Sequence, residues 1–252
     1  MTNCPVIMVH GAFCGGWAFD GFRRPFEAAG HACLTPDLRG RGGSAAAGLS
    51  MADYAADIAA LIKAQPTAPI LVGHSLGGLV AQLAATRAPV RGLILLAPSA
   101  PWGISGGSVE EAVSAVSLYA LGPYWLQAIE PDYMTACAYS LDRMDRTARD
   151  AIYARMVAES GRALWETLNW WMDPFMTTSV EPGRIGAPVL AIAGGADRVH
   201  PPSTVKQTAE RLGGEVRVFE TMSHWLVAEP GWDAVADACV AWIALHEAVA
   251  AE

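Results

Sequence analysis

A serine between two glycines is the residue of this chain best suited to nucleophilic chemistry. Gly73-His-Ser-Leu-Gly77 has the G-x-S-x-G spacing and lies between an apolar run expected to form a strand and a small-residue-rich segment expected to form a helix. Such a turn exposes the serine hydroxyl at the carboxyl end of the strand, and it needs glycines because a Cβ would clash there. The positive end of the helix points at the same place. We predict Ser75 as a nucleophile; the alternative is an ordinary Gly/Ser turn.

A serine hydroxyl is a weak nucleophile, so it needs a base, an acid that orients the base, and donors for an oxyanion. Asp197 follows an apolar run that ends at Ala193, and His224 follows another that ends near Phe219. Both are therefore expected on loops at carboxyl ends of strands, and Ser, Asp, His is a known chain order for such triads. We predict Asp197 as the orienting acid and His224 as the base. The alternatives are a turn-forming aspartate and a structural core histidine.

Two backbone N–H groups are expected to stabilise the oxyanion. One belongs to Leu76, directly after the serine, and the other to Ala12, in the loop His10-Gly-Ala-Phe-Cys-Gly-Gly-Trp17 that follows the first apolar run. The alternative for this loop is an ordinary glycine turn. Among the other histidines, we expect His10 and His74 to serve packing or loop hydrogen bonding, and His200 to be a surface or rim group.

Short apolar runs alternate with helical patterns, which is typical of parallel strands joined by helices. Strands are expected at residues 5–9, 69–73, 91–97, 187–193 and 215–219, and residues 32–35 lead into the loop that contains Asp37. Helical patterns are expected at about residues 16–29, from residue 51 to a point before Pro66, at residues 76–88 and from residue 233 to about residue 246. Ser50 and Asp53 resemble a capping box at the start of the second helix. The fold class is therefore α/β, with a mostly parallel sheet flanked by helices.

Residues 101–183 show only helical patterns, beginning with a capping-box sequence at Ser108-Val-Glu-Glu111. We expect a helical lid inserted into a core formed by residues 1–100 and 184–252. The lid holds more than half of the nine tryptophans. Aromatic side chains at helical spacing often pack as core, but some of these should cover an apolar pocket above the serine. The predicted pocket residues are Phe13, Trp102, Tyr124, Trp125, Trp170, Trp171 and Trp225.

Composition excludes several classes of protein. The 252 residues are 52% apolar and 17% charged, with a net charge of −8 and only two lysines. A disordered chain and a nucleic-acid partner are therefore not expected. Five scattered cysteines without zinc-ligand spacing predict buried thiols in a reducing, cytoplasmic compartment and no metal site. Residues 1–19 do not have the features of a signal peptide, and the uncharged stretch 64–86 is interrupted by proline, histidine and glycine, so we expect no membrane span.

Four motifs, taken in order, resemble those of serine hydrolases of the α/β-hydrolase fold over nearly the whole chain: His10-Gly11, Asp37-x-Arg-Gly-x-Gly-x-Ser44, Gly73-x-Ser-x-Gly77 and the pair Asp197 and His224. The HGAxxGGW form of the first loop is similar to that of the plant methylesterase and hydroxynitrile lyase group. This resemblance implies a reduced sheet of about six strands.

Two departures from the lyases of that group imply hydrolysis rather than cyanohydrin cleavage. Those lyases carry threonine at the position of Gly11 and lysine directly after the catalytic histidine, where this chain has Trp225. Serine at the turn also argues against haloalkane dehalogenases and epoxide hydrolases, which resemble this architecture but use aspartate.

The resemblance implies a serine esterase that acts on a small to medium, largely apolar carboxylic ester or lactone. It implies no cofactor, no metal, and no nucleic-acid or membrane partner, and it leaves the oligomeric state open. The same triad could instead hydrolyse a C–C bond, cleave a thioester or form a peracid. A receptor of this fold that binds a ligand and hydrolyses it poorly is a further alternative.

Overall fold

The computed structural model describes residues 4–41, 47–105 and 118–249. In this part of the chain, six parallel strands form one sheet in the order β2-β1-β3-β4-β7-β8. Their bounds are β1 (Val6–Val9), β2 (Cys33–Leu34), β3 (Ile70–His74), β4 (Gly92–Leu96), β7 (Val189–Gly194) and β8 (Glu215–Phe219). The predicted parallel sheet of about six strands is confirmed.

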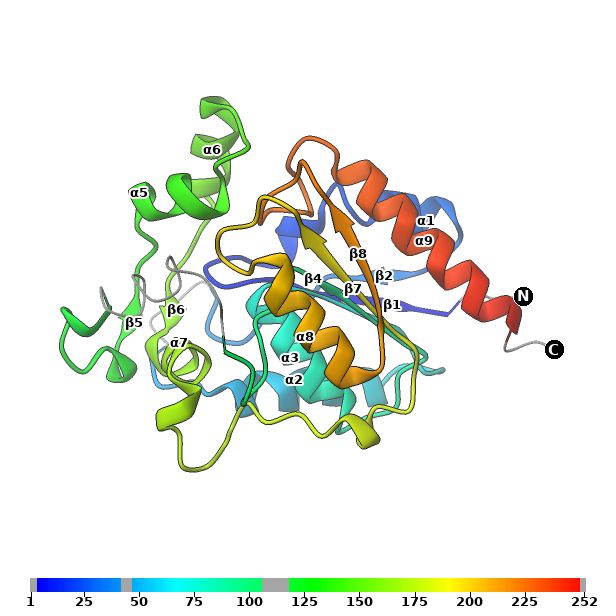
Figure 1. Cartoon of the computed structure of the whole chain (residues 1–252), viewed down its shortest axis with the longest axis horizontal. Coiled ribbons are helices and arrows are strands. Elements are labelled where there is room, and N and C mark those ends of the chain that lie inside the picture. Colours follow the sequence, from blue (N-terminus) through cyan, green and yellow to red (C-terminus); the bar gives the residue numbers. More distant parts are fainter. Residues whose placement is uncertain (1–3, 42–46, 106–117, 250–252) are drawn as a thin grey trace.

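Helices cover both faces of this sheet (Figure 1). One face carries α2 (Met51–Lys63), α3 (Leu76–Ala85) and α8 (Pro202–Leu212), and the other carries α1 (Arg24–Ala28) and α9 (Trp232–Val249). Because successive strand side chains point to opposite faces, each central strand contributes to two apolar cores. In β1, Ile7 and Val9 pack on the α3 side, whereas Val6 and Met8 pack on the α9 side.

The order in which the strands follow one another across the sheet reverses at β1. This strand pairs with β2 on one side and with β3 on the other, and Val9 is in register with Gly73. In open α/β sheets the loops that follow two such strands separate at the carboxyl edge and leave a crevice, which is where ligands bind. The loop after β1 and the turn after β3 therefore begin side by side at this crevice.

In the insertion (residues 101–183), the described residues 118–172 lie beyond the carboxyl ends of the strands (Figure 1). Its described helices and turns are η3 (Tyr124–Leu126), α5 (Tyr133–Thr135), the π-helical η4 (Ala136–Ser140), α6 (Arg146–Tyr153), α7 (Gly161–Leu168) and η5 (Trp170–Met172), with η6 (Pro182–Arg184) following it. The prediction of helices alone is wrong, because β5 (Ala128–Ile129) and β6 (Glu159–Ser160) form an antiparallel pair. These two strands are too short for a period of two to be visible in the sequence. The capping-box sequence at Ser108–Glu111 lies outside the described residues.

Other local predictions fare differently. The capping box of α2 is confirmed, since Ser50 Oγ accepts from Asp53 N and the Asp53 carboxylate accepts from Ser50 N. The helical stretch expected over residues 16–29 is divided in two: η1 (Gly16–Phe19) and α1 are separated by a turn, and Pro25 lies in the first turn of α1. No helix in the described ranges has the length and apolar character needed to cross a membrane.

The chain passes from β3 into α3 through a turn in which backbone segments touch. A Cβ on Gly73 would lie 2.4 Å from the carbonyl oxygen of Gly77, and a Cβ on Gly77 would lie 2.3 Å from the carbonyl oxygens of both Val9 and His10. These atoms belong to the backbone of buried elements, so they cannot move aside as a flexible side chain could. Glycine is required at both positions because of this close approach.

Replacing Gly77 with alanine should destabilise the protein by about 3 kcal/mol, because the added methyl group overpacks a rigid backbone contact. Gly183 is the matched control, since a Cβ there meets nothing within 4 Å. The Gly183→Ala variant should stay within about 0.5 kcal/mol of the wild type. Urea unfolding of the three proteins measures the difference, and equal stability of the two variants would contradict the predicted contact.

Candidate active site

The backbone of Ser75 adopts a conformation that non-glycine residues rarely take. Its φ is 53° and its ψ is −125°, and it is the residue directly before α3. Three hydrogen bonds hold it: its N–H donates to Leu96 O over 3.0 Å, and its carbonyl accepts from Gly78 N at 2.8 Å and from Ser99 N at 3.0 Å. Such strained residues persist only where surrounding structure fixes them, and they occur mainly at functional sites.

The structure brings the three predicted triad residues together in one chain of hydrogen bonds. Ser75 Oγ lies 3.0 Å from His224 Nε2, and His224 Nδ1 lies 2.9 Å from Asp197 Oδ2. The network is satisfied when the serine O–H donates to Nε2 and Nδ1–H donates to the carboxylate. All three residues are buried. The arrangement can transfer a proton from the serine to the histidine while the carboxylate balances the imidazolium.

Asp197 is held by the loop that it begins. Its Oδ1 accepts from Val199 N at 2.8 Å and from His200 N at 3.0 Å. Burial on its own would raise the pKa of this carboxyl, but His224 and the backbone N–H groups outweigh that effect and lower the pKa below its ordinary value. Asp197 therefore stays ionised at neutral pH, as an orienting acid requires.

The two expected oxyanion donors, Ala12 and Leu76, line the same cavity as Ser75. The N–H of Leu76 belongs to the first turn of α3 and so has no partner within the helix. In the ranges that the structure describes, neither this N–H nor that of Ala12 has an acceptor. Both are thus available to a ligand bound beside Ser75.

Two further histidines flank His224. The His74 and His200 rings lie 5.1 Å and 5.2 Å from the His224 ring. His74 Nε2–H donates to His224 O over 2.9 Å, and His200 Nε2 lies 3.0 Å from Ser99 Oγ. Burial lowers the pKa of His74 to about 3 and that of His200 to about 4, so both rings are neutral. The expectation that His200 is a surface or rim group is wrong, because the loop that holds Asp197 turns its side chain inward. Its position three residues after Asp197 is the sequence feature that could have indicated this.

A cavity of about 610 Å³ opens above Ser75. Of the predicted pocket residues, Phe13 and Trp225 line it, whereas Trp102, Tyr124, Trp125, Trp170 and Trp171 do not. The described part of the insertion instead contributes one aromatic residue, Tyr139, together with smaller apolar side chains: Leu118, Leu121, Ile129, Pro131, Ala136, Met156, Leu164 and Leu168. No lysine or arginine is among the described lining residues, and the acidic ones are Glu130 and Asp132.

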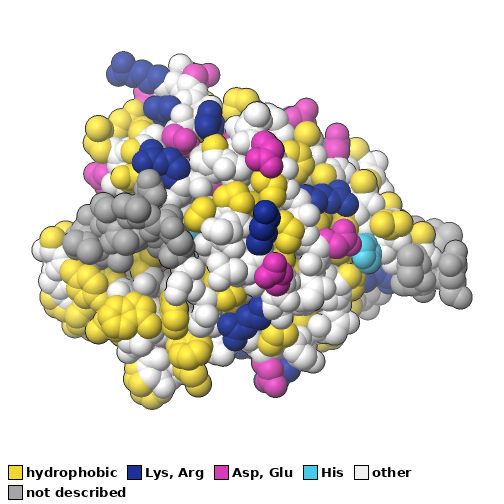
Figure 2. All heavy atoms as spheres, in the orientation of Figure 1, with side chains coloured by type: hydrophobic (Ala, Val, Ile, Leu, Met, Phe, Trp, Pro, Cys, Tyr) yellow, Lys and Arg dark blue, Asp and Glu magenta, His cyan; other side chains and the backbone are white. Residues whose placement is uncertain are grey.

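The five predicted aromatics that do not line the cavity lie on the segments next to α7, pack on them or are exposed. The Tyr124 side chain is buried and accepts from Asn169 Nδ2 at 2.7 Å, and Trp102 packs edge to face on Trp170 with ring centroids 5.3 Å apart. Trp171 is 66% exposed. Figure 2 shows hydrophobic side chains gathered over the end of the molecule that the insertion forms. Hydrophobic periodicity could not show which of these side chains face the cavity, because η3 and η5 are single turns.

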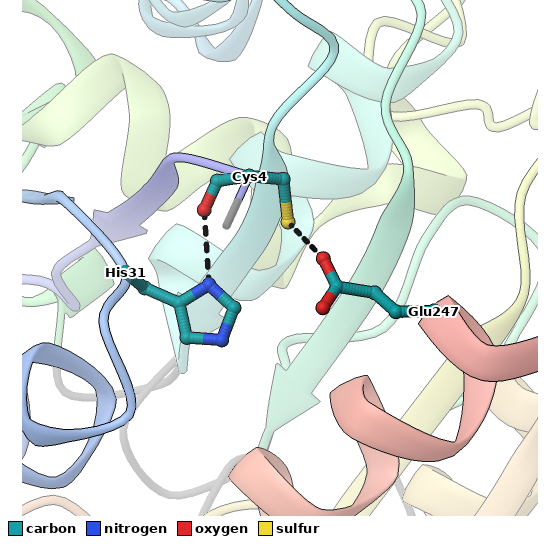
Figure 3. A group of neighbouring side chains, drawn as sticks. All are labelled: Cys4, His31 and Glu247. Carbon is teal, nitrogen blue, oxygen red and sulfur yellow. Dashed lines mark hydrogen bonds between the residues drawn. The ribbon is translucent and has the colours of Figure 1, made fainter. Parts of the chain in front are cut away.

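A second cluster of potential ligand atoms lies away from this cavity. Cys4, His31 and Glu247 each present one ligand atom, and these atoms lie within 4.8 Å of one another (Figure 3). The sequence did not anticipate the cluster, because its members precede β1, precede β2 and lie on α9. The Cys4 thiol donates to Glu247 Oε1 over 3.1 Å, and His31 Nδ1–H donates to Cys4 O over 3.0 Å. Burial raises the pKa of the thiol to about 12, so at neutral pH it is a neutral hydrogen-bond donor to Glu247.

Comparison with known proteins now identifies the family. The model of the alpha/beta hydrolase family matches residues 6–238. The chain belongs to this family. A solved structure of a methylesterase from Arabidopsis superposes with a TM-score of 0.73 at 18% identity, covering 96% of this chain and 99% of that chain. The predicted α/β-hydrolase fold is confirmed, and a methylesterase is among the solved structures that share it.

Two curated relatives share a shorter segment with this family member. The carbendazim hydrolyzing esterase of Nocardioides sp. (strain SG-4G) is 36% identical over 96 residues, which cover 36% of this chain and 40% of that protein. The pyrethroid hydrolase of Sphingobium wenxiniae is 35% identical over 101 residues, which cover 38% of this chain and 36% of that protein. The chain thus aligns with about two fifths of the length of these relatives.

Three buried neutral histidines should make the stability of the protein depend on pH. Burial holds the pKa of His10, His74 and His200 at about 4, 3 and 4, against 6.5 in an exposed histidine. Between pH 6.5 and 4 the unfolded chain binds protons that the folded chain does not. The free energy of unfolding should therefore fall as the pH falls, by up to about 1.4 kcal/mol per pH unit for each histidine.

Urea unfolding at pH 7, 6 and 5 measures this slope. The His200→Gln variant lacks one of the three histidines, so the slope of its unfolding free energy against pH should be smaller by up to about 1.4 kcal/mol per pH unit. A slope that does not change in this variant would mean that His200 is protonated in the folded protein.

Proposed function

We propose that this protein is a serine hydrolase that cleaves a small to medium, largely apolar carboxylic ester or lactone. Ser75 Oγ attacks the carbonyl carbon while His224 Nε2 takes the serine proton, and the oxyanion is stabilised by the N–H groups of Ala12 and Leu76. His224 then gives the proton to the departing alkoxide oxygen, which leaves an acyl group on the serine. Water, activated by His224, releases the acid in a second, equivalent step.

The observation that carries the proposal is the continuous hydrogen-bond chain from Ser75 through His224 to Asp197 at the cavity surface. A second serine and histidine pair lines the same cavity, because Ser99 Oγ lies 3.0 Å from His200 Nε2. In the described part of the chain, however, His200 Nδ1 has no partner, so no acid orients this ring. This difference favours Ser75 as the nucleophile.

The cavity lining supports an apolar, uncharged substrate. Its described residues include no lysine or arginine that could pair with an anion, and Glu130 and Asp132 would repel one. The names of the two curated relatives, an esterase and a hydrolase, favour ester cleavage over the other reactions open to such a triad.

Residues of both parts of the chain line the cavity, which supports a lid role for the insertion. Leu118 and Leu164 belong to the insertion, and Phe13 and Trp225 to the segments that carry the sheet. We assign residues 101–183 as the lid and residues 1–100 and 184–252 as the hydrolase core.

Turnover of p-nitrophenyl esters with short and medium acyl chains tests the proposal. An esterase should reach a kcat of about 1 s⁻¹ or more on at least one of them. A protein that binds these esters but releases p-nitrophenol only at the uncatalysed rate would instead be a ligand receptor. Parallel assays of lactones, thioesters and diketones separate the esterase from enzymes that use the same residues on another bond.

The Ser75→Ala variant should lower kcat by roughly three to six powers of ten, because the three residues act as a unit. Ser99→Ala is the matched control, and it should retain at least about a tenth of wild-type activity because its histidine has no orienting acid. Ser75 would not be the nucleophile if the Ser75→Ala variant kept most of its activity, or if only the Ser99→Ala variant lost activity.

The Asp197→Asn variant should lower kcat by up to about 10⁴, because an amide favours the wrong tautomer of His224. Asp173 gives a matched control: it is also buried, and it accepts from Phe175 N at 3.0 Å and Thr177 N at 2.7 Å without contacting the triad. Asp173→Asn should therefore keep kcat near the wild-type value. If Asp197→Asn did so too, another carboxylate would be the orienting acid.

A further inference from the structure

The loop that carries the oxyanion donor Ala12 contains a second strained residue. Phe13, the next residue, has a φ of 62° although it is not a glycine. A bulky residue in this conformation needs surrounding contacts to keep it there. The position of the Ala12 N–H therefore depends on whatever holds Phe13.

Both backbone polar groups of Phe13 are bonded to the insertion. Phe13 N donates to Glu159 Oε2 over 3.3 Å, and Phe13 O accepts from Val157 N at 2.9 Å. Within the described ranges, the oxyanion loop is thus tied to β6 across more than 140 residues of sequence.

The Glu159 carboxylate accepts hydrogen bonds from two donors at each of its oxygens. Its side chain is fully buried and forms an ion pair with Arg41, whose side chain is 4% exposed. Oε1 accepts from Tyr54 O–H at 2.7 Å and from Ser160 N at 2.8 Å, while Oε2 accepts from Arg41 and from Phe13 N. A buried carboxylate is tolerated when its charge and lone pairs are satisfied in this way.

Arg41 extends this anchor to the loop after β2. Its Nη1 donates to Ala158 O over 3.0 Å, so the guanidinium holds Glu159, the first residue of β6, and the residue before it. A buried guanidinium that donates to two acceptors fixes geometry more firmly than an exposed ion pair does. The carboxylate of Glu159 is therefore a rigid support for Phe13.

We infer that Glu159 is a positioning residue for the oxyanion hole and that it makes catalysis depend on the seating of the insertion. This inference rests on the proposed function. The carboxylate holds Phe13 in its strained conformation, and Phe13 in turn aims the N–H of Ala12 at the developing oxyanion. Donors of this kind act only when their geometry is fixed beforehand, so a small displacement lowers the rate of the chemical step more than it lowers substrate affinity.

The Glu159→Gln variant tests this role. The carboxylate accepts donors at both oxygens, whereas an amide presents its own donor on one side and so cannot satisfy all four groups. We expect kcat to fall by about 10- to 100-fold, less than the 10²- to 10³-fold loss on removing an oxyanion donor, with KM changed by less than about threefold. The inhibition constant of a boronic acid that forms a tetrahedral adduct with Ser75 should rise by the factor by which kcat/KM falls.

Glu166 provides a matched control in the same insertion. It is also buried, it accepts a backbone N–H (Met51 N, 2.7 Å), and it pairs with an arginine (Arg162 Nε, 2.9 Å), but it does not contact the oxyanion loop. Glu166→Gln should lower thermal stability while leaving kcat within about twofold of the wild type. The comparison separates positioning from a general loss of stability.

Amide hydrogen exchange gives a readout that does not depend on turnover. Peptides covering residues 10–14 should exchange faster in Glu159→Gln and at the wild-type rate in Glu166→Gln. If Glu159→Gln does not fold, the Arg41→Met/Glu159→Leu variant removes both charges together, leaves Phe13 N–H without its acceptor, and should show the same exchange and kcat effects.

Unchanged exchange at residues 10–14 together with a kcat equal to that of Glu166→Gln would overturn the inference. Absence of ester turnover in the wild type would instead contradict the proposed function, and exchange would still decide whether Glu159 holds the loop.

Discussion

The close approach of three backbone segments beneath Ser75 is the constraint on which the rest of the site depends. The serine can adopt a φ of 53° only because β3, α3 and the end of β1 meet without intervening side chains, with glycine at residues 73 and 77. That contact joins the turn carrying Ser75 to the strand whose following loop carries Ala12. The strain at Ser75 and the placement of the oxyanion loop are therefore consequences of the same packing.

Chemistry is concentrated at one edge because every strand of the sheet runs in the same direction. The turn after β3, the loop after β7 and the loop after β8 all end at the carboxyl edge, so residues separated by up to 149 positions come within hydrogen-bond distance. The surroundings of these buried groups set their charge states. Asp197 keeps its charge because His224 and backbone N–H groups compensate it, whereas the flanking His74 and His200 remain neutral and add no positive charge beside His224.

Sequence reasoning succeeds here where a residue is constrained locally and fails where tertiary packing decides. The spacing of Gly73, Ser75 and Gly77 records a steric requirement, and Ser50 with Asp53 records a hydrogen-bond requirement, so both are visible in the sequence. Nothing local distinguishes the tryptophans that surround α7 from residues that would face the cavity. Glu159 could not be singled out either, because its importance comes from Phe13, Tyr54 and Arg41, which lie far away in the chain.

The charge of the cavity wall also bears on what happens after bond cleavage. In the proposed reaction a neutral ester becomes a carboxylate, and the product therefore carries a negative charge that the substrate lacked. The described lining residues include no lysine or arginine that could pair with this anion, and Glu130 and Asp132 add negative charge to the wall. In the proposed reaction the carboxylates of the wall therefore disfavour the charged product relative to the neutral ester, which favours product release.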